Sequence, residues 1–156
     1  MASRPLTGLA AGLLAGAAGV TAHNAVTYVH QALTGSASPS SPASDVPART
    51  ADGATPAPVQ TAAAGPLGGT VLGVVIGAAA GALRGLSTTP PQPVAAVGVG
   101  VAAWASALGA AAATGAARPT TPQQTAIEAL SHLAYGVVTV LALHHLLDPR
   151  TPVVPR

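Results

Sequence analysis

Residues 66–86, PLGGTVLGVVIGAAAGALRGL, decide how this chain folds. The segment carries no ionised side chain before Arg84, and it matches the length of about 20 apolar residues that an α-helix needs to cross a bilayer. A helix on the surface of a water-soluble protein needs a polar face, and this segment offers none. The segment therefore predicts a transmembrane helix.

The composition of the whole chain extends this prediction. Of its 156 residues, 6% are charged, whereas a soluble domain carries about 25% charged residues. Because so few charges cannot cover a water-facing surface, the composition disfavours an ordinary soluble protein. The absence of Cys excludes disulfide frameworks and thiol chemistry, and the scattered Arg residues give no basic patch that would favour nucleic-acid binding.

Three further segments have the same character, at residues 6–28, 93–114 and 125–147, and each is bounded by Pro, Gly, Ser or Thr. The helical pattern of the first continues to Leu33. We therefore expect an all-α fold, a polytopic bundle of four transmembrane helices that forms a single membrane domain over residues 1–156. A soluble bundle of four Ala-rich helices is the competing interpretation, and it is disfavoured because the segments have no Lys/Glu stripes.

Residues 34–64 separate the first two segments with Pro, Ser, Thr and Ala and scarcely any side chain that builds a core. Such a stretch cannot offset its ordering entropy by burial, so we expect a disordered linker. An O-glycosylated, mucin-like linker is the functional alternative to a plain spacer, and the composition favours the spacer.

The Arg residues set the expected orientation, because cytoplasmic loops carry an excess of Lys and Arg. With both termini in the cytoplasm and the linker outside, the basic residues on the inner side are Arg4, Arg84, Arg150 and Arg156. The outer side then holds Arg49 and Arg118, together with Asp45, Asp52 and Glu128. We expect a multi-pass protein of the cell membrane.

The first segment also resembles a cleavable signal peptide. Arg4 precedes the apolar run of residues 6–20, and small residues follow at Val20-Thr21-Ala22. Cleavage would leave a secreted or cell-wall protein. We rank this interpretation below the multi-pass one, because the apolar helical pattern continues past residue 22.

Glycines recur at every fourth residue along the second segment and, with one shorter step, along the first. In lipid, small residues at this spacing let two helix backbones approach closely. The pattern predicts helix packing through Gly8, Gly12, Gly16 and Gly19 on the first segment and Gly69, Gly73, Gly77 and Gly81 on the second. The third segment offers a similar stripe, Gly98, Ala102, Ala105 and Gly109. Packing within the chain is favoured over oligomerisation or a pore.

Polar side chains inside the apolar segments are the stronger functional signal, because they are costly there. They recur at i, i+4 and i+7, which places them on one face of each helix: His23, Thr27 and His30 on the first, and Glu128, His132 and Tyr135 on the fourth. The expected topology places both stripes in the outer third of the membrane, where they can meet.

Two interpretations of this polar cluster remain open. An interfacial cap would hydrogen-bond lipid headgroups and neighbouring helices, and the expected depth favours it. A proton relay or ligand site would instead use Glu128, His132 and His23. A metal site that adds His30 is a weak variant, because i, i+7 spacing alone is a poor ligand signature. We expect no metal, no cofactor and no catalytic residue, since no enzyme fingerprint is present.

Two stretches of the chain carry a family resemblance. They are AGAAGVTAHNAVTYVHQAL at residues 15–33, followed by SPSSP, and SHLAYGVVTVLAL at residues 131–143. Together they resemble a group of small four-helix membrane proteins common in actinobacteria, in which an A-V-T-Y-like run precedes a Ser/Pro segment and an H-L-A-Y-G motif opens the last helix. The resemblance implies four spans and a cell-membrane location, and it implies no activity.

The expected function is non-enzymatic. The glycine stripes favour an accessory or assembly subunit that acts through helix contacts, with the lipid bilayer and another membrane protein or a second copy as its partners. The alternative is a minimal proton-linked carrier that uses the Glu/His cluster.

Overall fold

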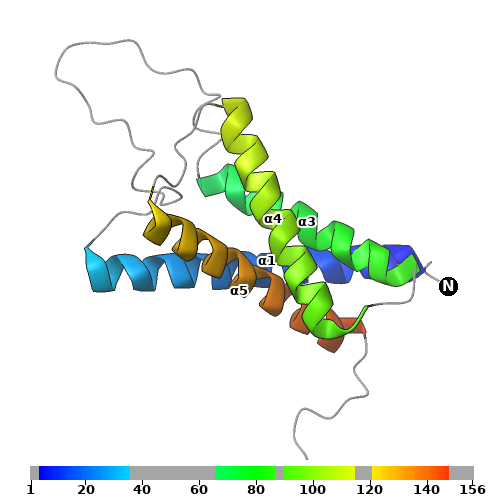
Figure 1. Ribbon diagram of the computed structural model, residues 1–156. Coiled ribbons are helices and arrows are strands. Elements are labelled where there is room, and N and C mark those ends of the chain that lie inside the picture. The colour runs from blue at the N-terminus through cyan, green and yellow to red at the C-terminus, as the bar shows by residue number, and fades with distance from the viewer. Residues whose placement is uncertain (1–3, 36–65, 87–89, 115–120, 148–156) are drawn as a thin grey trace, which may run out of the picture.

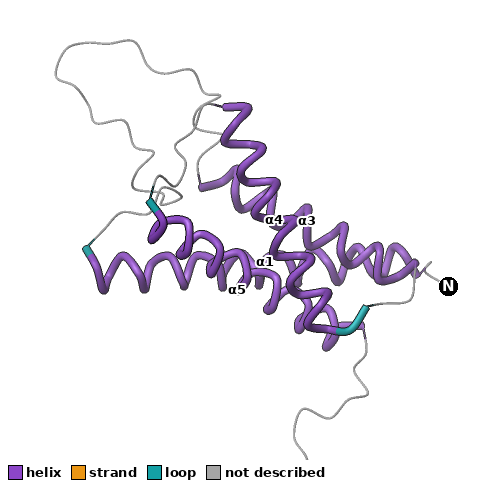
Figure 2. Tube along the Cα trace, in the orientation of Figure 1, coloured by secondary structure: helices purple, strands orange, loops and turns teal. Residues whose placement is uncertain are grey.

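The computed structural model describes residues 4–35, 66–86, 90–114 and 121–147 (Figure 1). This part of the chain forms four α-helices and no strand (Figure 2): α1 (Arg4–Thr34), α3 (Pro66–Leu86), α4 (Gln92–Thr114) and α5 (Pro122–Leu147). Each helix is long and apolar enough to cross a membrane. The all-α prediction is therefore confirmed for the described residues, and the predicted linker lies outside them from residue 36 onward.

The first helix is longer than the span expected at residues 6–28. It has 31 residues, or about 46 Å at 1.5 Å per residue. It ends where Gly35 takes a φ of 65° and donates its backbone N–H to the carbonyl of Gln31 at 2.8 Å. A residue other than glycine rarely adopts this left-handed cap, so Gly35 fixes the end of α1.

The last helix starts three residues before the expected position 125. The backbone N–H of Gln124 donates to Thr121 Oγ1, and the backbone N–H of Thr121 donates to Gln124 Oε1, both at 3.2 Å. This reciprocal pair is a capping box, and Pro122 occupies the first helical position, where a missing N–H costs nothing. Thr121, Gln123 and Gln124 therefore belong to the helix start and not to the preceding loop.

The central helix is α1, which runs antiparallel to α3 on one side and antiparallel to α5 on the other (Figure 1). Its glycines meet those of α3 in reverse order, Gly8 beside Gly81 and Gly16 beside Gly73. Helix α4 packs mainly on α5, and it crosses the other helices steeply in the view of Figure 1. The bundle is therefore a three-helix layer with α4 attached to its outer side.

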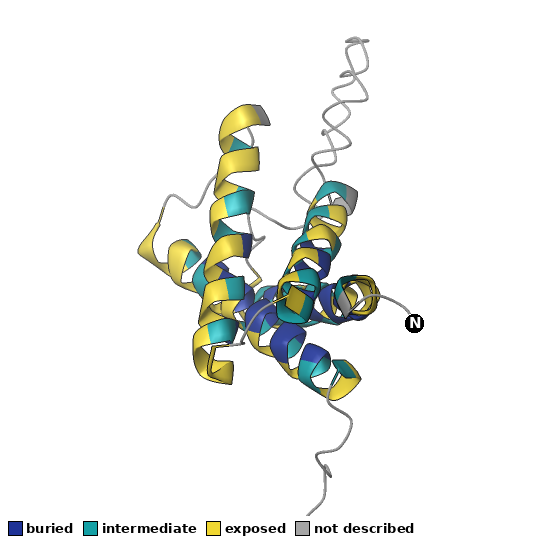
Figure 3. Cartoon of the chain, turned by 90° about the vertical axis from the view of Figure 1, so that its right-hand side faces the viewer, coloured by how far each residue is buried: buried dark blue, intermediate teal, exposed yellow. Residues whose placement is uncertain are grey.

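Burial follows this arrangement (Figure 3). The buried residues gather where the helices face one another, and the outer faces of the helices are exposed. Ala15 is fully buried, and Leu143 is 2% exposed. Large apolar side chains such as Leu14, Val71 and Val101 lie more than half exposed on the outside. An apolar exterior around a small-residue interior is the pattern expected when lipid, and not water, surrounds the helices.

Candidate functional site

The α1–α3 interface is a backbone contact. A Cβ atom built on Gly12 would lie 2.7 Å from the Cα of Ala78, and one built on Gly16 would lie 2.9 Å from the carbonyl oxygen of Gly73. Real Cβ atoms do not come this close, so these positions accept only glycine at the observed helix separation. The interface includes Gly8, Gly12 and Gly16 of α1 and Gly73, Gly77 and Gly81 of α3, whereas Gly69 has nothing within 4 Å.

On its other side, α1 brings a polar stripe against α5. The ring of His23 meets the ring of His132 edge to face, with their centroids 4.6 Å apart and their planes at 74°. His132 is buried and His23 is partly buried. Because the two helices are antiparallel, residues 109 positions apart in the chain become direct neighbours inside the bundle.

The carboxyl group of Glu128 completes this group. Glu128 Oε2 lies 3.8 Å from Nδ1 of His132, and the same nitrogen lies 2.8 Å from the backbone carbonyl of Glu128. Glu128 is also buried. An Nδ1–H donated to this carbonyl leaves Nε2 as the proton-accepting atom of His132. We call His23, Glu128 and His132 the His/Glu group.

Tyr135 belongs to a different contact from the one its spacing predicts. Its hydroxyl donates a hydrogen bond of 2.6 Å to the backbone carbonyl of Gly73 on α3. A Cβ atom on Gly73 would be in ordinary van der Waals contact with the tyrosine ring, at 3.5 Å, and would collide with the side chain of Val20 on α1. Tyr135 is 2% exposed, and its hydrogen bond connects α5 to α3 about one helical turn after His132.

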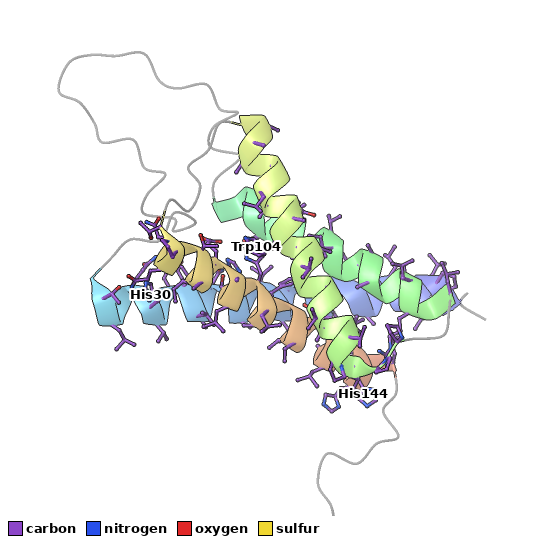
Figure 4. The ribbon with its side chains drawn as sticks, viewed as in Figure 1. His30, Trp104 and His144 are labelled. Atoms are coloured by element: carbon purple, nitrogen blue, oxygen red, sulfur yellow. The ribbon has the colours of Figure 1, made fainter. Side chains whose placement is uncertain are left out.

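The two remaining predicted residues, Thr27 and His30, both lie on α1. Thr27 is buried, but its hydroxyl donates to the carbonyl of His23 at 3.2 Å within its own helix. His30 lies about 10 Å further along α1 than His23, from seven residues of helical rise, near the end of that helix (Figure 4). The ring contact and the ion pair therefore join three of the six predicted residues, His23, Glu128 and His132.

The helix ends define where the two histidines of this group lie along their helices. Gly19 lies midway between the ends of α1, so His23 is one turn, about 6 Å, from the middle of its helix. The middle of α5 lies between residues 134 and 135, about 4 Å from His132. Both imidazoles are thus close to the middles of their helices, and their depth in the membrane stays a prediction.

A pocket of about 200 Å³ lies between α4 and α5, and it reaches His132. Its walls include Val97, Val101 and Leu133, which are exposed on the outside of the bundle. Trp104, in the middle of α4, lines the same pocket (Figure 4). The pocket therefore opens between α4 and α5 to the outside of the bundle.

Sequence spacing does not identify two residues near this site, Ser131 and Trp104. The Ser131 hydroxyl is buried and donates to the carbonyl of Glu128 at 2.9 Å. The indole nitrogen of Trp104 is buried without a hydrogen-bond partner. Trp104 is conspicuous in the sequence as a Trp in the middle of an Ala/Gly helix. Its proximity to His132, however, depends on how α4 crosses α5, which the sequence does not show.

Metal binding is not supported by the geometry. Among the residues that the structure describes, no group of three or more His, Cys, Asp or Glu is placed to hold a metal ion. The four-residue metal variant is therefore not supported among these residues.

Compared with known protein families, curated proteins and solved structures, the chain gives no match. Any functional conclusion therefore depends on the geometry of the site, and the resemblance to small actinobacterial membrane proteins stays a prediction.

Proposed function

We propose that this protein is a multi-pass membrane protein that exchanges protons at the His/Glu group, as a minimal proton-linked carrier. The observation that supports it is the contact between His23 of α1 and His132 of α5, with Glu128 beside it, near the middles of helices long enough to span a bilayer. A bilayer centred on these helices would surround the group with hydrocarbon.

The cost of this placement favours a functional role over an interfacial cap. A charged side chain at the centre of a transmembrane helix costs about 3 kcal/mol on insertion scales, and a cap would place the same residues near the headgroups at little cost. An ionisable carboxyl next to an imidazole can keep the pair neutral overall by sharing one proton. Proton exchange is the chemistry that such a pair offers.

An apolar pocket adjoins His132 on the flank of the bundle. It opens between α4 and α5, and α4 is the helix with the smallest buried share. A movement of α4 relative to α5 would change the access to His132, and it would have to separate the two backbones where they touch at Gly100 and Gly136. Alternating access in a carrier requires a mobile element of this kind.

Trp104 provides a direct test at the site, because it is the single Trp of the chain and lines the pocket with His132. Protonated imidazole quenches indole fluorescence, so we expect Trp104 emission in vesicles to fall on acidification. His132→Asn should abolish the fall, whereas the matched control His145→Asn, exposed near the end of α5, should keep it. A fall that persists in His132→Asn would contradict proton binding at this residue.

The activity itself is tested in liposomes that hold a pH-sensitive dye. Reconstituted protein should carry protons after an external acid step, and Glu128→Gln should lower the rate to that of empty liposomes. A wild-type rate equal to that of empty liposomes would refute the carrier.

A second function, an accessory or assembly subunit, is favoured by the outer face of α4. Gly98, Ala102, Ala105 and Gly109 are all exposed, and nothing lies within 4 Å of a Cβ atom built on either glycine. Since the chain has no Cys, Ala105→Cys gives a single site for crosslinking in membranes. A crosslinked product that disappears in a Gly98→Leu, Gly109→Leu background would support this function, and a monomeric product would contradict it.

A further inference from the structure

The end of the bundle away from Glu128 gathers basic side chains from two helices. Arg84 stands in the last turn of α3, and His144 and His145 stand in the last turn of α5. Arg84 Nη2 lies 3.4 Å from His144 Nδ1, and the rings of the two histidines are 5.8 Å apart. Figure 4 shows His144 at the lower end of α5.

The glycine register brings a third helix to the same end. Gly8 of α1 faces Gly81 of α3, and Gly12 faces Gly77, so each step along α1 corresponds to a step back along α3. The backbone of Arg4, where α1 begins, is therefore level with the last turn of α3. Three helices thus place Arg or His residues at one end of the bundle.

The hydrogen bond between Arg84 and His144 defines what this end can bind. An arginine always donates, so Nδ1 of His144 accepts and the proton of the neutral ring resides on Nε2. The guanidinium keeps its other N–H groups for further acceptors, and it recognises phosphate and carboxylate oxygens in a planar, bidentate manner. Among the described residues Glu128 is the single acid, and it lies in the opposite half of α5. Among the described residues at this end of the bundle, Arg84 therefore contributes a positive charge, and no carboxylate lies beside it.

The apolar surroundings identify the source of the anion. Leu83 and Leu86 of α3 and Leu146 of α5 are 63%, 67% and 47% exposed around the basic residues. Exposed leucines beside a guanidinium fit a molecule that joins an anionic head to acyl chains. They would contribute nothing to binding of a free phosphate ion.

We propose that Arg84, His144 and His145 form a binding site for the phosphate group of an anionic phospholipid. Basic residues between helices at the membrane surface are a recurrent site for such headgroups. The site is separate from the His/Glu group, and it does not depend on the proton-carrier proposal.

The test uses the full-length protein in neutral detergent micelles and measures lipid retained in native mass spectrometry. The probes are dioleoyl phosphatidylglycerol, which is anionic, dioleoyl phosphatidylcholine, which has the same phosphodiester but no net charge, and inorganic phosphate as competitor. We expect preferential retention of phosphatidylglycerol, and Arg84→Gln should weaken it about fivefold, the effect of one cation near an anionic headgroup. Arg49→Gln removes one positive charge from the sequence 34–64 and should leave retention unchanged.

Two results would overturn the proposal: equal retention of both lipids by the wild type, or unchanged retention by Arg84→Gln. Full displacement of phosphatidylglycerol by inorganic phosphate would overturn the lipid as the source. If far-UV circular dichroism shows that Arg84→Gln does not fold, His145→Asn replaces it. His145 is exposed, and its loss should weaken retention about twofold.

Discussion

The central helix α1 packs against its two neighbours through surfaces of different chemistry. Toward α3 it presents glycines, and the two backbones touch. Toward α5 it presents Gly19, which lies against the side chains of Tyr135 and Thr139, and one turn further His23, which meets His132. The first interface provides close packing that dispersion forces reward in lipid, and it offers no chemistry. The second contains ionisable groups whose burial is costly, and it therefore holds the candidate site.

We expect a substitution in the glycine interface between α1 and α3 to lower the free energy of unfolding more than one in the interface between α1 and α5. Gly12→Leu should unfold the bundle or lower its free energy of unfolding by more than about 3 kcal/mol, because overpacking here collides with backbone and not with a flexible side chain. The measurement is SDS-induced unfolding in mixed micelles, followed by circular dichroism. Gly69→Leu is the matched control, since nothing lies within 4 Å of that glycine. Equal effects of the two variants would show that α1 and α3 do not pack as described.

The two interfaces also differ in how far the sequence predicts them. Close packing of Gly8, Gly12 and Gly16 depends on the absence of side chains, which the spacing indicates. The same spacing also selects Gly69, Gly98 and Gly109, and nothing lies within 4 Å of a Cβ atom built on any of them. The position of Tyr135 depends on the register of α5 against α3, which no local pattern encodes, so its bond to Gly73 is not predictable. The end of α1 depends on a single residue, because Gly35 and not the end of the apolar run terminates the helix.

A smaller effect is expected where the two interfaces are joined. Tyr135→Phe removes the hydrogen bond to the carbonyl of Gly73 and should lower the free energy of unfolding by about 1 kcal/mol, as for other hydrogen bonds between helices in lipid. Tyr28→Phe is the control, because Tyr28 is 49% exposed. If Tyr28→Phe lowers the free energy of unfolding as much as Tyr135→Phe does, the hydrogen bond between α5 and α3 does not contribute to stability.

The smallest effect on the free energy of unfolding is expected at Thr27. A substitution there tests whether its hydroxyl acts within α1 or between helices. Its hydroxyl bonds to the carbonyl of His23 in its own helix, and valine has nearly the same shape. Thr27→Val should therefore change the free energy of unfolding by less than about 0.5 kcal/mol and leave the fluorescence titration of Trp104 unaltered. A loss of that titration would place Thr27 in the proton-exchanging group.

The depth of Trp104 in a bilayer tests the central claim most directly, because this residue shares a pocket with His132 in the middle of the helices. The protein is reconstituted into lipids brominated either next to the ester groups or near the ends of the acyl chains, and quenching of Trp104 emission is compared. Our account predicts stronger quenching by bromine near the chain ends and none by iodide in the water. Stronger quenching by the shallow bromine, or by iodide, would contradict burial of this site within the membrane.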